Sequence, residues 1–459
     1  MNLVVSQIRK SLRGEVTVPG DKSISHRALM LGAISSGTTE IEGLLRAEDT
    51  LNTAAALRAM GVSIEGLDED MGIRQAMRSF ARAAGVDGHK LDRGRDVKVE
   101  GVGLRGLRQP GRPLDMGNSG TGMRLLAGIL AGQHFEVELT GDESLSSRPM
   151  DRIAVPLKLM GAQVTGNGEK CLPPLRVRGG KLKAIEYELP VASAQVKSAI
   201  LLAGLYADGE TAILEPGPSR DHTERMLQFF GADVLVRGPR VRVRGDAELR
   251  GQRVPVPGDI SAAAFFMALA AIAPDVEVLV RGTGINTKRA GMIEVLKEMG
   301  ASVTVSAARQ QAGEPTADVG VRRGKLKGVD IGGAIVPRLI DEVPILCVAA
   351  AVASGRTEIR DVAELRVKES DRIATMAEGL SRMGAHVEVG PDSISIRGGH
   401  LRGAEVNSHG DHRVAMALIV AGLVASGRTV VQGAECIATS YPRFAEGLRN
   451  LGADVREEE

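Results

Sequence analysis

Two kinds of apolar segment alternate along this chain of 459 residues. The first kind, such as residues 199–205, is apolar on every side, which is typical of a helix buried on all faces. The second kind mixes charged and apolar residues at helical spacing, so residues 288–299 are predicted to form an amphipathic helix. Short Thr- and Val-rich runs between the helices indicate β-strands. Alternation of this kind favours an α/β fold.

A glycine recurs where each amphipathic helix is predicted to end. These glycines follow Met, Phe or Leu and precede Ala or Val; they are Gly61, Gly161, Gly231, Gly300, Gly384 and Gly452. Successive members are 100, 70, 69, 84 and 68 residues apart. This spacing predicts one repeat unit of about 70 residues used six times, with two insertions. Each repeat unit reads as strand, helix, strand, helix, strand and a further short strand.

The tetrapeptide Val-Pro-Gly-Asp occurs twice, at residues 18–21 and 256–259. Pro-Gly pairs punctuate chains, and three repeat units lie between the two copies and three after the second. We therefore expect one lobe of residues 21–257 and a second lobe formed by residues 1–20 with residues 258–459. The step of 100 residues places an insertion near residues 68–95, which we expect to be a surface excursion.

Composition narrows the function classes. The formal net charge is only +1, so no global charge drives the chain toward nucleic acid or an anionic membrane, and we expect neither as a partner. No apolar run is long enough to suggest a membrane span, and the first ten residues lack a signal core. Cys171, Cys347 and Cys436 show no metal-ligand spacing. We expect a cytoplasmic protein with reduced thiols and no metal.

Polar and cationic residues gather where helices are predicted to begin. The loops before the apolar helices are residues 20–27, 117–124, 192–197, 258–261, 340–344 and 410–413. Equivalent loops before the second helices are residues 146–152, 218–225, 366–372 and 438–443. Helix N-termini carry free N–H groups and partial positive charge, so helices aimed at one cleft would bind anions there. The cations exceed the needs of one phosphate, which indicates two polyanionic ligands or one large one.

Several residues of these loops have simpler interpretations. Asp21, Asp259 and Asp411 each follow a glycine at a helix start, where a carboxylate is a common cap. His26 and His412, taken singly, are typical of structural histidines. Arg152 and Arg225 are typical of solvated surface charges. Two carboxylates differ, because Asp341 and Glu369 stand among cations. Both are open to two interpretations, a structural ion pair or a general acid–base group.

Eight of these sites form a series in chain order. They are residues 19–28 (Pro-Gly-Asp-Lys-Ser-Ile-Ser-His-Arg-Ala), 117–124 (Gly-Asn-Ser-Gly-Thr-Gly-Met-Arg), 147–150, 193–195, 220–223, Asp341, 366–372 and 411–413. Across essentially the whole chain, the series resembles the 5-enolpyruvylshikimate-3-phosphate (EPSP) synthase family of enolpyruvyl transferases. The resemblance implies a two-lobed fold of six βαβαββ units, three per lobe. We expect a monomer. It also implies enolpyruvyl transfer from phosphoenolpyruvate to the 5-hydroxyl of shikimate 3-phosphate, with release of phosphate and without a metal or organic cofactor.

The same resemblance implies residue roles. Residues expected to hold shikimate 3-phosphate are Lys22, Ser23, Arg27, Ser193, Ala194, Gln195, Arg220, Asp341 and Lys368. Residues expected to hold phosphoenolpyruvate are Lys22, Asn118, Gly120, Arg148, Gln195, Arg372, His412 and Arg413. Asp341 would accept the proton of the 5-hydroxyl, and Glu369, with Lys22, would handle the proton at the methylene carbon. Gly120 would leave room for the herbicide glyphosate, which implies a sensitive enzyme.

The chain departs from one branch of the family at three positions. That branch has serines where this chain has Ala194 and Pro216, and a lysine where this chain has Thr439. Arg220 could replace the phosphate contact of the missing serine. No phosphate role is assigned to Thr439.

Two alternatives remain open. The enolpyruvyl transferase acting on UDP-N-acetylglucosamine has Asn where this chain has Ser23, and usually a loop cysteine that residues 140–152 lack. A non-catalytic repeat scaffold that binds anions is the other alternative. Asp341 and Glu369 among cations argue against a scaffold.

Overall fold

The computed structural model describes residues 1–67 and 96–458, and the insertion predicted near residues 68–95 lies outside these ranges. The described chain divides into two compact domains. Domain 1 comprises Met1–Pro19, Pro257–Gln310 and Pro315–Glu459, and domain 2 comprises Gly20–Val256 with Gln311–Glu314.

Domain 2 alternates strands and helices. In chain order its elements are α1 (Lys22–Ile34), β3 (Ser36–Glu42), α2 (Glu48–Ala59), β4 (Ser63–Glu65), β5 (Val97–Val102), β6 (Leu114–Asp115), α4 (Gly120–Leu130), β7 (Glu136–Thr140), α5 (Glu143–Ser146), α6 (Asp151–Met160), β8 (Gln163–Asn167), β9 (Leu172–Arg178), β10 (Leu182–Lys183), β11 (Glu186–Glu188), α7 (Ala194–Gly204), β12 (Ala207–Asp208), β13 (Glu210–Leu214), α8 (His222–Phe229), β14 (Val234–Arg237), β15 (Arg240–Arg244) and β16 (Arg253–Pro255).

Domain 1 has the same alternation, with short 3-10 helices (η) in its loops. Its elements are β1 (Asn2–Ser6), β2 (Leu12–Thr17), α9 (Ile260–Ile272), β17 (Val276–Gly284), α10 (Gly291–Met299), β18 (Ser302–Gln311), β19 (Glu314–Arg322), β20 (Asp330–Ile331), η2 (Gly333–Arg338), η3 (Ile340–Glu342), α11 (Val343–Val352), β21 (Arg356–Ile359), η4 (Ala363–Val367), α12 (Arg372–Arg382), β22 (His386–Val389), β23 (Ile394–Arg397), β24 (Glu405–Asn407), α13 (His412–Val424), β25 (Arg428–Gln432), η5 (Ala434–Thr439), α14 (Phe444–Asn450) and β26 (Val455–Glu458).

Each domain builds three four-stranded sheets from its described residues, and all six sheets share one strand pattern. In domain 2 the orders are β6-β7-β9-β8, β11-β13-β15-β14 and β16-β3-β5-β4. In domain 1 they are β20-β21-β23-β22, β18-β19-β17-β2 and β24-β25-β1-β26. In the first of these sheets, the edge strand β6 precedes helix α4 and pairs with β7 in parallel. The pairs β7–β9 and β8–β9 are antiparallel. The predicted fold of six βαβαββ units is confirmed.

Three repeat units are completed by strands from distant parts of the sequence. β16 pairs with β3 across more than 200 residues, β2 pairs with β17, and β1 lies between β25 and β26. In the other repeat units, a strand close by in the sequence takes the same position in the sheet. The N-terminal segment is therefore an integral part of two sheets of domain 1.

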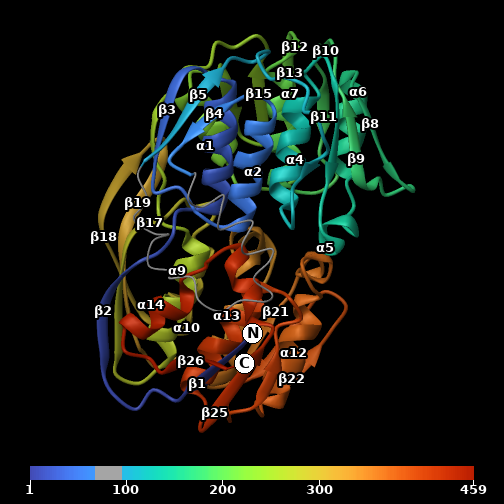
Figure 1. The fold of residues 1–459 in the computed structure, drawn as a ribbon. Coiled ribbons are helices and arrows are strands. Elements are labelled where there is room, and N and C mark those ends of the chain that lie inside the picture. The colour runs from blue at the N-terminus through green and yellow to red at the C-terminus, as the bar shows by residue number, and fades with distance from the viewer. Residues whose placement is uncertain (68–95, 459) are drawn as a thin grey trace. The chain divides into compact units, whose positions relative to one another are not determined.

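The first helix of each repeat unit is buried on all sides, as its apolar sequence predicts. Every residue of α9 is buried, and α13 is buried from His412 to Leu423. In domain 2, α1, α4 and α7 lie side by side with the strands around them (Figure 1). These helices lie within the two hydrophobic cores, which are filled almost entirely by Ala, Leu, Ile, Val and Met.

The six recurring glycines have a backbone reason. All have positive φ, between 90° at Gly61 and 110° at Gly161. A left-handed residue ends a helix by turning its N–H back onto the last carbonyls, and glycine adopts this conformation without a Cβ penalty. Gly300 N, for example, donates to the carbonyl oxygen of Lys297 at 3.0 Å.

One predicted helix starts later than expected. The sequence predicts a helix over residues 288–299, but α10 begins at Gly291. Lys288 and Arg289 therefore lie in the preceding loop, and Arg289 is 3% exposed rather than on a solvated face.

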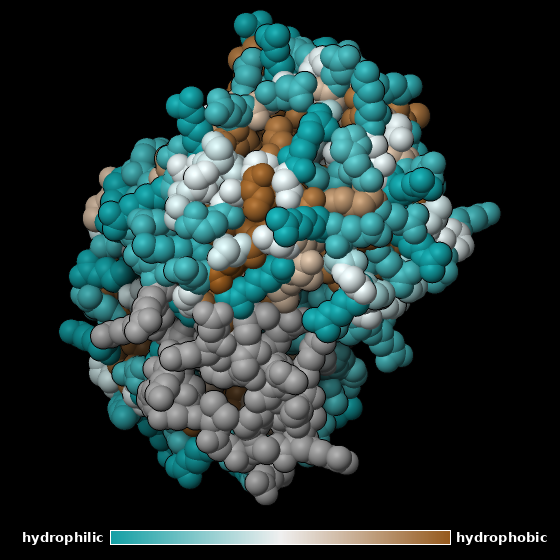
Figure 2. Space-filling view, turned by 45° about the horizontal axis from the view of Figure 1, so that its top comes forward, coloured by the Kyte–Doolittle hydropathy of each residue, from teal (hydrophilic) through white to brown (hydrophobic). Residues whose placement is uncertain are grey.

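The visible surface is mostly hydrophilic, and its hydrophobic atoms form several separate areas (Figure 2). In the part of the chain that the structure describes, no helix is both long and apolar enough to cross a membrane.

Gly128 lets α4 approach α7. A Cβ at this position would lie 2.3 Å from the carbonyl oxygen of Ala199 and 2.9 Å from its Cα. Gly128→Ala should therefore lower the free energy of unfolding by about 1–3 kcal/mol through overpacking, although alanine favours an isolated helix. Urea unfolding would measure this loss. Gly111→Ala, with open space around its Cβ, is the control, and equal stability of both variants would contradict the close packing.

Candidate functional site

The starts of three helices meet in domain 2. Arg124 Nη1 on α4 donates to Gln195 Oε1 on α7 at 2.9 Å. Arg27 Nη2 on α1 donates to Ser198 Oγ on α7 at the same distance. These bonds link α1, α4 and α7 close to their N-termini, where the helix dipoles concentrate positive potential. The arrangement suits an anion.

His26 links α1 to two further elements. Its Nδ1 lies 2.9 Å from Thr53 Oγ1 on α2, and its Nε2 lies 3.4 Å from Oγ of Ser119, the cap of α4. Burial, helped by the charges of Lys22 and Arg27, lowers the pKa of His26 to about 3. A neutral imidazole buried between two hydroxyls fits the structural interpretation of this residue.

The aspartates predicted to cap helices do so. Asp21 Oδ1 accepts from Ile24 N at 2.9 Å, and Asp259 Oδ1 accepts from Ser261 N at 2.7 Å. Asp411 Oδ1 accepts from Arg413 N at 2.9 Å, which leaves its other oxygen for an ion pair described below.

Three residues predicted to hold phosphoenolpyruvate, Asn118, Gly120 and Arg148, cluster at the start of α4 in domain 2. Arg148 Nη2 donates to Asn118 Oδ1 at 2.7 Å and to Ser144 Oγ at 2.9 Å. A Cβ on Gly120 would lie 2.8 Å from Arg124 Nη1 and 3.3 Å from Arg148 Nη1. Gly120 therefore lies against two guanidinium groups, and any side chain there would push on them.

Lys22 is the first residue of α1 and reaches toward α2. Its Nζ lies 3.0 Å from Asp49 Oδ2, and both side chains are largely buried. Sequence analysis did not single out Asp49, which lies in the first turn of α2. Ser23 follows Lys22, and its carbonyl oxygen accepts from Arg27 Nη1 at 2.8 Å.

The predicted shikimate 3-phosphate residues of α7 also lie at a helix start. Ser193 caps α7, and Ala194 is its first residue. Gln195 Nε2 donates to Thr121 Oγ1 at 2.9 Å, next to Gly120 on α4. Arg220 lies in the loop before α8, as the sequence predicts.

In domain 1, Asp341 lies among three guanidinium groups. Its carboxylate is 3.4 Å from Arg372 Nη1, 3.9 Å from Arg413 Nη2 and 4.0 Å from Arg289 Nη1. Arg413 Nη1 also donates to the backbone carbonyl of Asp341 at 3.3 Å. This joins the loop before α11 to the start of α13, where His412 is the first helical residue.

Arg372 is buried at the centre of this cluster, with 2% of its side chain exposed. It contacts three carboxylates, Asp411 at 2.7 Å, Glu369 at 2.5 Å and Asp341 at 3.4 Å. Burial alone would lower the pKa of its guanidinium, but these carboxylates raise it well above the usual value. Arg372 therefore holds a fixed positive charge beside both predicted acid–base residues.

Lys368 takes a different partner. Its Nζ lies 2.6 Å from Glu364 Oε1, one turn earlier in the chain, and the side chain is partly exposed. A phosphate contact by Lys368 would have to compete with this pair.

Sequence analysis missed Arg289. It was assigned to the polar face of a helix, but it is buried and contacts Glu342 at 3.4 Å and Ser261 Oγ at 2.8 Å. A signal was present, because residues 286–290 occupy the same place in their repeat unit as residues 366–372 do in theirs. Glu342, next to Asp341, was also missed, because its burial results from packing between helix starts and not from its place in the sequence.

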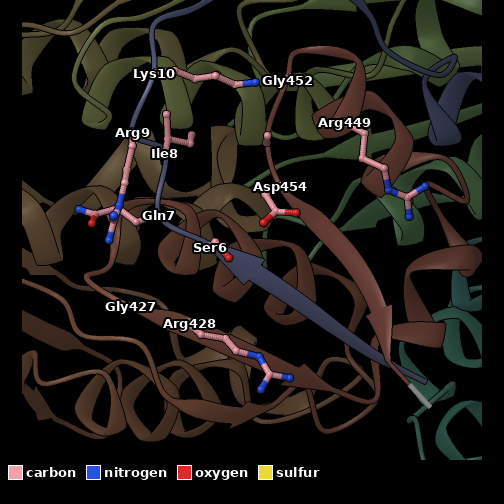
Figure 3. Close-up of a pocket in the computed structure, with 11 residues that line it drawn as sticks. Ser6, Gln7, Ile8, Arg9, Lys10, Gly427, Arg428, Arg449, Gly452 and Asp454 are labelled. Atoms are coloured by element: carbon pink, nitrogen blue, oxygen red, sulfur yellow. The ribbon is translucent and has the colours of Figure 1, made fainter.

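A pocket of about 810 Å³ in domain 1 lies apart from these residues. It is lined by Ser6–Lys10, Gly427, Arg428, Arg449 and Gly452–Asp454. The side chains of Arg9, Arg428 and Arg449 point in different directions (Figure 3), so they do not converge on one ligand.

Known proteins with similar sequences indicate the family to which this chain belongs. The sequence pattern of the family described as EPSP synthase (3-phosphoshikimate 1-carboxyvinyltransferase) matches residues 6–80 and 73–448. This chain belongs to the EPSP synthase family. The family assignment made from the motifs is confirmed.

Curated relatives in the EPSP synthase family are similar over nearly their whole length. A 3-phosphoshikimate 1-carboxyvinyltransferase of Gloeobacter violaceus is 53% identical over 96% of this chain and 97% of its own. One from Desulforamulus reducens is 50% identical over 98% of this chain and 99% of its own. A solved EPSP synthase structure from Acinetobacter baumannii is 47% identical, with a TM-score of 0.84 over 99% of this chain and 100% of its own.

Acidification should destabilise the protein through His26. An unfolded imidazole titrates near 6.5, whereas the folded pKa is about 3, so the unfolded state binds more protons between these values. Stability present above pH 6.5 is therefore lost as the pH falls, by at most ~1.4 kcal/mol per pH unit. Urea unfolding at pH 7 and pH 5 would show a smaller pH effect in His26→Gln. An equal effect in both proteins would contradict a neutral, buried His26.

Proposed function

We propose that this chain transfers the enolpyruvyl group of phosphoenolpyruvate to the 5-hydroxyl of shikimate 3-phosphate and releases phosphate. The observation that carries the proposal is the pair of carboxylates, Asp341 and Glu369, on the buried guanidinium of Arg372. Asp411 already pairs with Arg372, so two further carboxylates at this guanidinium are more than a structural ion pair requires. A reaction that moves protons beside bound anions needs both.

Both substrates carry a phosphate and a carboxylate, which guanidinium groups bind with paired hydrogen bonds. For shikimate 3-phosphate, the proposed contacts are Lys22, Ser23, Arg27, Ser193, Ala194, Gln195, Arg220, Asp341 and Lys368. For phosphoenolpyruvate, they are Lys22, Asn118, Gly120, Arg148, Gln195, Arg372, His412 and Arg413. Helix starts add backbone N–H donors to these side chains.

In the proposed mechanism, Asp341 accepts the proton of the 5-hydroxyl of shikimate 3-phosphate while the hydroxyl oxygen attacks C2 of phosphoenolpyruvate. The methylene carbon C3 takes a proton from Glu369, assisted by Lys22, and a tetrahedral intermediate results. Glu369, now a carboxylate, then takes a proton back from C3, which re-forms the double bond as the C2–O bond to phosphate breaks, and the departing phosphate takes the proton from Asp341. Atoms and charge balance without a redox step.

The surroundings of Arg372 support Glu369 as the proton donor. Three carboxylates share the guanidinium of Arg372, and they differ in how far solvent and substrate can reach them. Asp411 is fully buried and caps α13, so it is committed to structure. Glu369 is the most exposed of the three, at 19%, and is therefore the best placed to exchange a proton with a substrate.

Phosphate release tests the function and the two carboxylates together. Asp341→Asn and Glu369→Gln should each lower kcat by roughly 10²–10⁴-fold, the usual contribution of acid–base catalysis. Glu388→Gln, on an exposed strand of the same domain, is the matched control and should keep full activity.

Two results would count against the assignment. Near-normal turnover of either variant would remove that residue from the mechanism. Phosphate release with UDP-N-acetylglucosamine, but not with shikimate 3-phosphate, as the acceptor would favour the other enolpyruvyl transferase.

Gly120 should control inhibition by glyphosate. A methyl group at this position would press on the guanidinium groups of Arg124 and Arg148, which we propose border the phosphoenolpyruvate site. Gly120→Ala should therefore raise the inhibition constant of glyphosate, and raise the KM for phosphoenolpyruvate to a smaller extent. Steady-state kinetics against Gly111→Ala as control would measure both. An unchanged inhibition constant would refute the steric account.

A further inference from the structure

A buried lysine in domain 2 has no part in the mechanism above. Lys197, on α7, has no exposed side-chain surface. Its Nζ lies 3.0 Å from Glu215 Oε2 and 2.6 Å from Glu224 Oε1, and both glutamates are also buried. Burying three charges costs desolvation free energy that hydrophobic residues of similar size would avoid. A role beyond packing would explain such a cluster.

The cluster of Lys197, Glu215 and Glu224 adjoins the residues that hydrogen-bond to Arg27. Arg27 Nε donates to Thr223 Oγ1 at 2.6 Å, and its Nη2 donates to Ser198 Oγ at 2.9 Å. These two hydroxyls are 2.7 Å apart, and they belong to the residues next to Glu224 and Lys197 in the sequence. The groups that orient Arg27 are therefore the immediate neighbours of the Lys–Glu pair.

The same cluster fixes the loop that bears Arg220. Ser219 Oγ donates to Glu215 Oε1 at 2.5 Å, one residue before Arg220. Burial lowers the pKa of Arg27 to about 10, while Glu224 and Asp21 raise it and Arg220 lowers it. The two guanidiniums and the Lys–Glu cluster thus act on one another electrostatically.

Charge balance shows what Lys197 changes. Arg27 feels the charges of Arg220, Glu224, Asp21, which caps α1, and Glu314, whose Oε1 lies 2.7 Å from His222 Nδ1. Glu215 accepts from Ser219, the residue before Arg220. With Lys197 present, Glu215 and Glu224 have a cation of their own. Without it, both would draw on Arg27 and Arg220 and compete with a bound anion.

We propose that Lys197 is a positioning residue that neutralises Glu215 and Glu224 and so keeps Arg27 and Arg220 available for the phosphate of shikimate 3-phosphate. This inference rests on the proposed function, which assigns both arginines to that phosphate. Lys197 itself does not touch the substrate; it acts through the charge and orientation of the two guanidiniums.

Calorimetric titration with shikimate 3-phosphate tests the inference. Lys197→Met keeps the length of the side chain but removes its charge, and should weaken binding by about tenfold or more. Lys197→Met/Glu224→Gln restores the original net charge and should recover most of the affinity. A merely structural role predicts the opposite order, because the double variant has lost more contacts. If the double variant does not recover affinity for shikimate 3-phosphate, the proposal is overturned.

A second variant keeps the test valid if Lys197→Met folds poorly, as thermal unfolding would reveal. Glu215→Gln leaves Lys197 paired with Glu224 and removes one competing anion. It should bind shikimate 3-phosphate at least as tightly as the parent protein. Weaker binding would overturn the proposal.

Arg220→Gln separates failure of this inference from failure of the proposed function. If Arg220→Gln binds shikimate 3-phosphate normally, the phosphate assignment is wrong and the inference falls with it. If Arg220→Gln loses affinity while Lys197→Met does not, only the positioning role of Lys197 is wrong.

Discussion

The structure depends on one electrostatic constraint: the starts of buried helices gather positive charge that must be balanced. In domain 2, α1, α4 and α7 meet around Arg27, Arg124 and Gln195. In domain 1, the loop before α11 meets α13 around Asp341 and Arg413. Helix dipoles and arginines there favour anions, and carboxylates of the protein supply part of the balance. Substrates with phosphate and carboxylate groups can supply the remainder.

Much of the fold was readable from the sequence because a single backbone requirement repeats. Each second helix ends at a left-handed glycine, so six glycines mark six repeat units. The apolar first helices are buried because they have no polar face. The partners of β16, β2 and β1 could not be read in this way, since strand pairing over hundreds of residues leaves no local signal.

The candidate site was predictable where a residue belongs to a helix-start loop, as Arg372 and Asp341 do, and where a motif resembles the family. Prediction failed where burial decides the role. Arg289 has the sequence environment of a surface helix, yet α10 starts after it and packing encloses it. Lys197 stands in an apolar helix, and only the fold brings Glu215 and Glu224 to its Nζ.

The central claim is that these helix starts bind the substrate anions. A crystal structure with shikimate 3-phosphate tests it most directly. The account predicts that the phosphate of the ligand lies within hydrogen-bonding distance of Arg27 and Arg220, near the starts of α1 and α7. A phosphate bound elsewhere, for example among Arg9, Arg428 and Arg449, with the helix starts unoccupied, would contradict it.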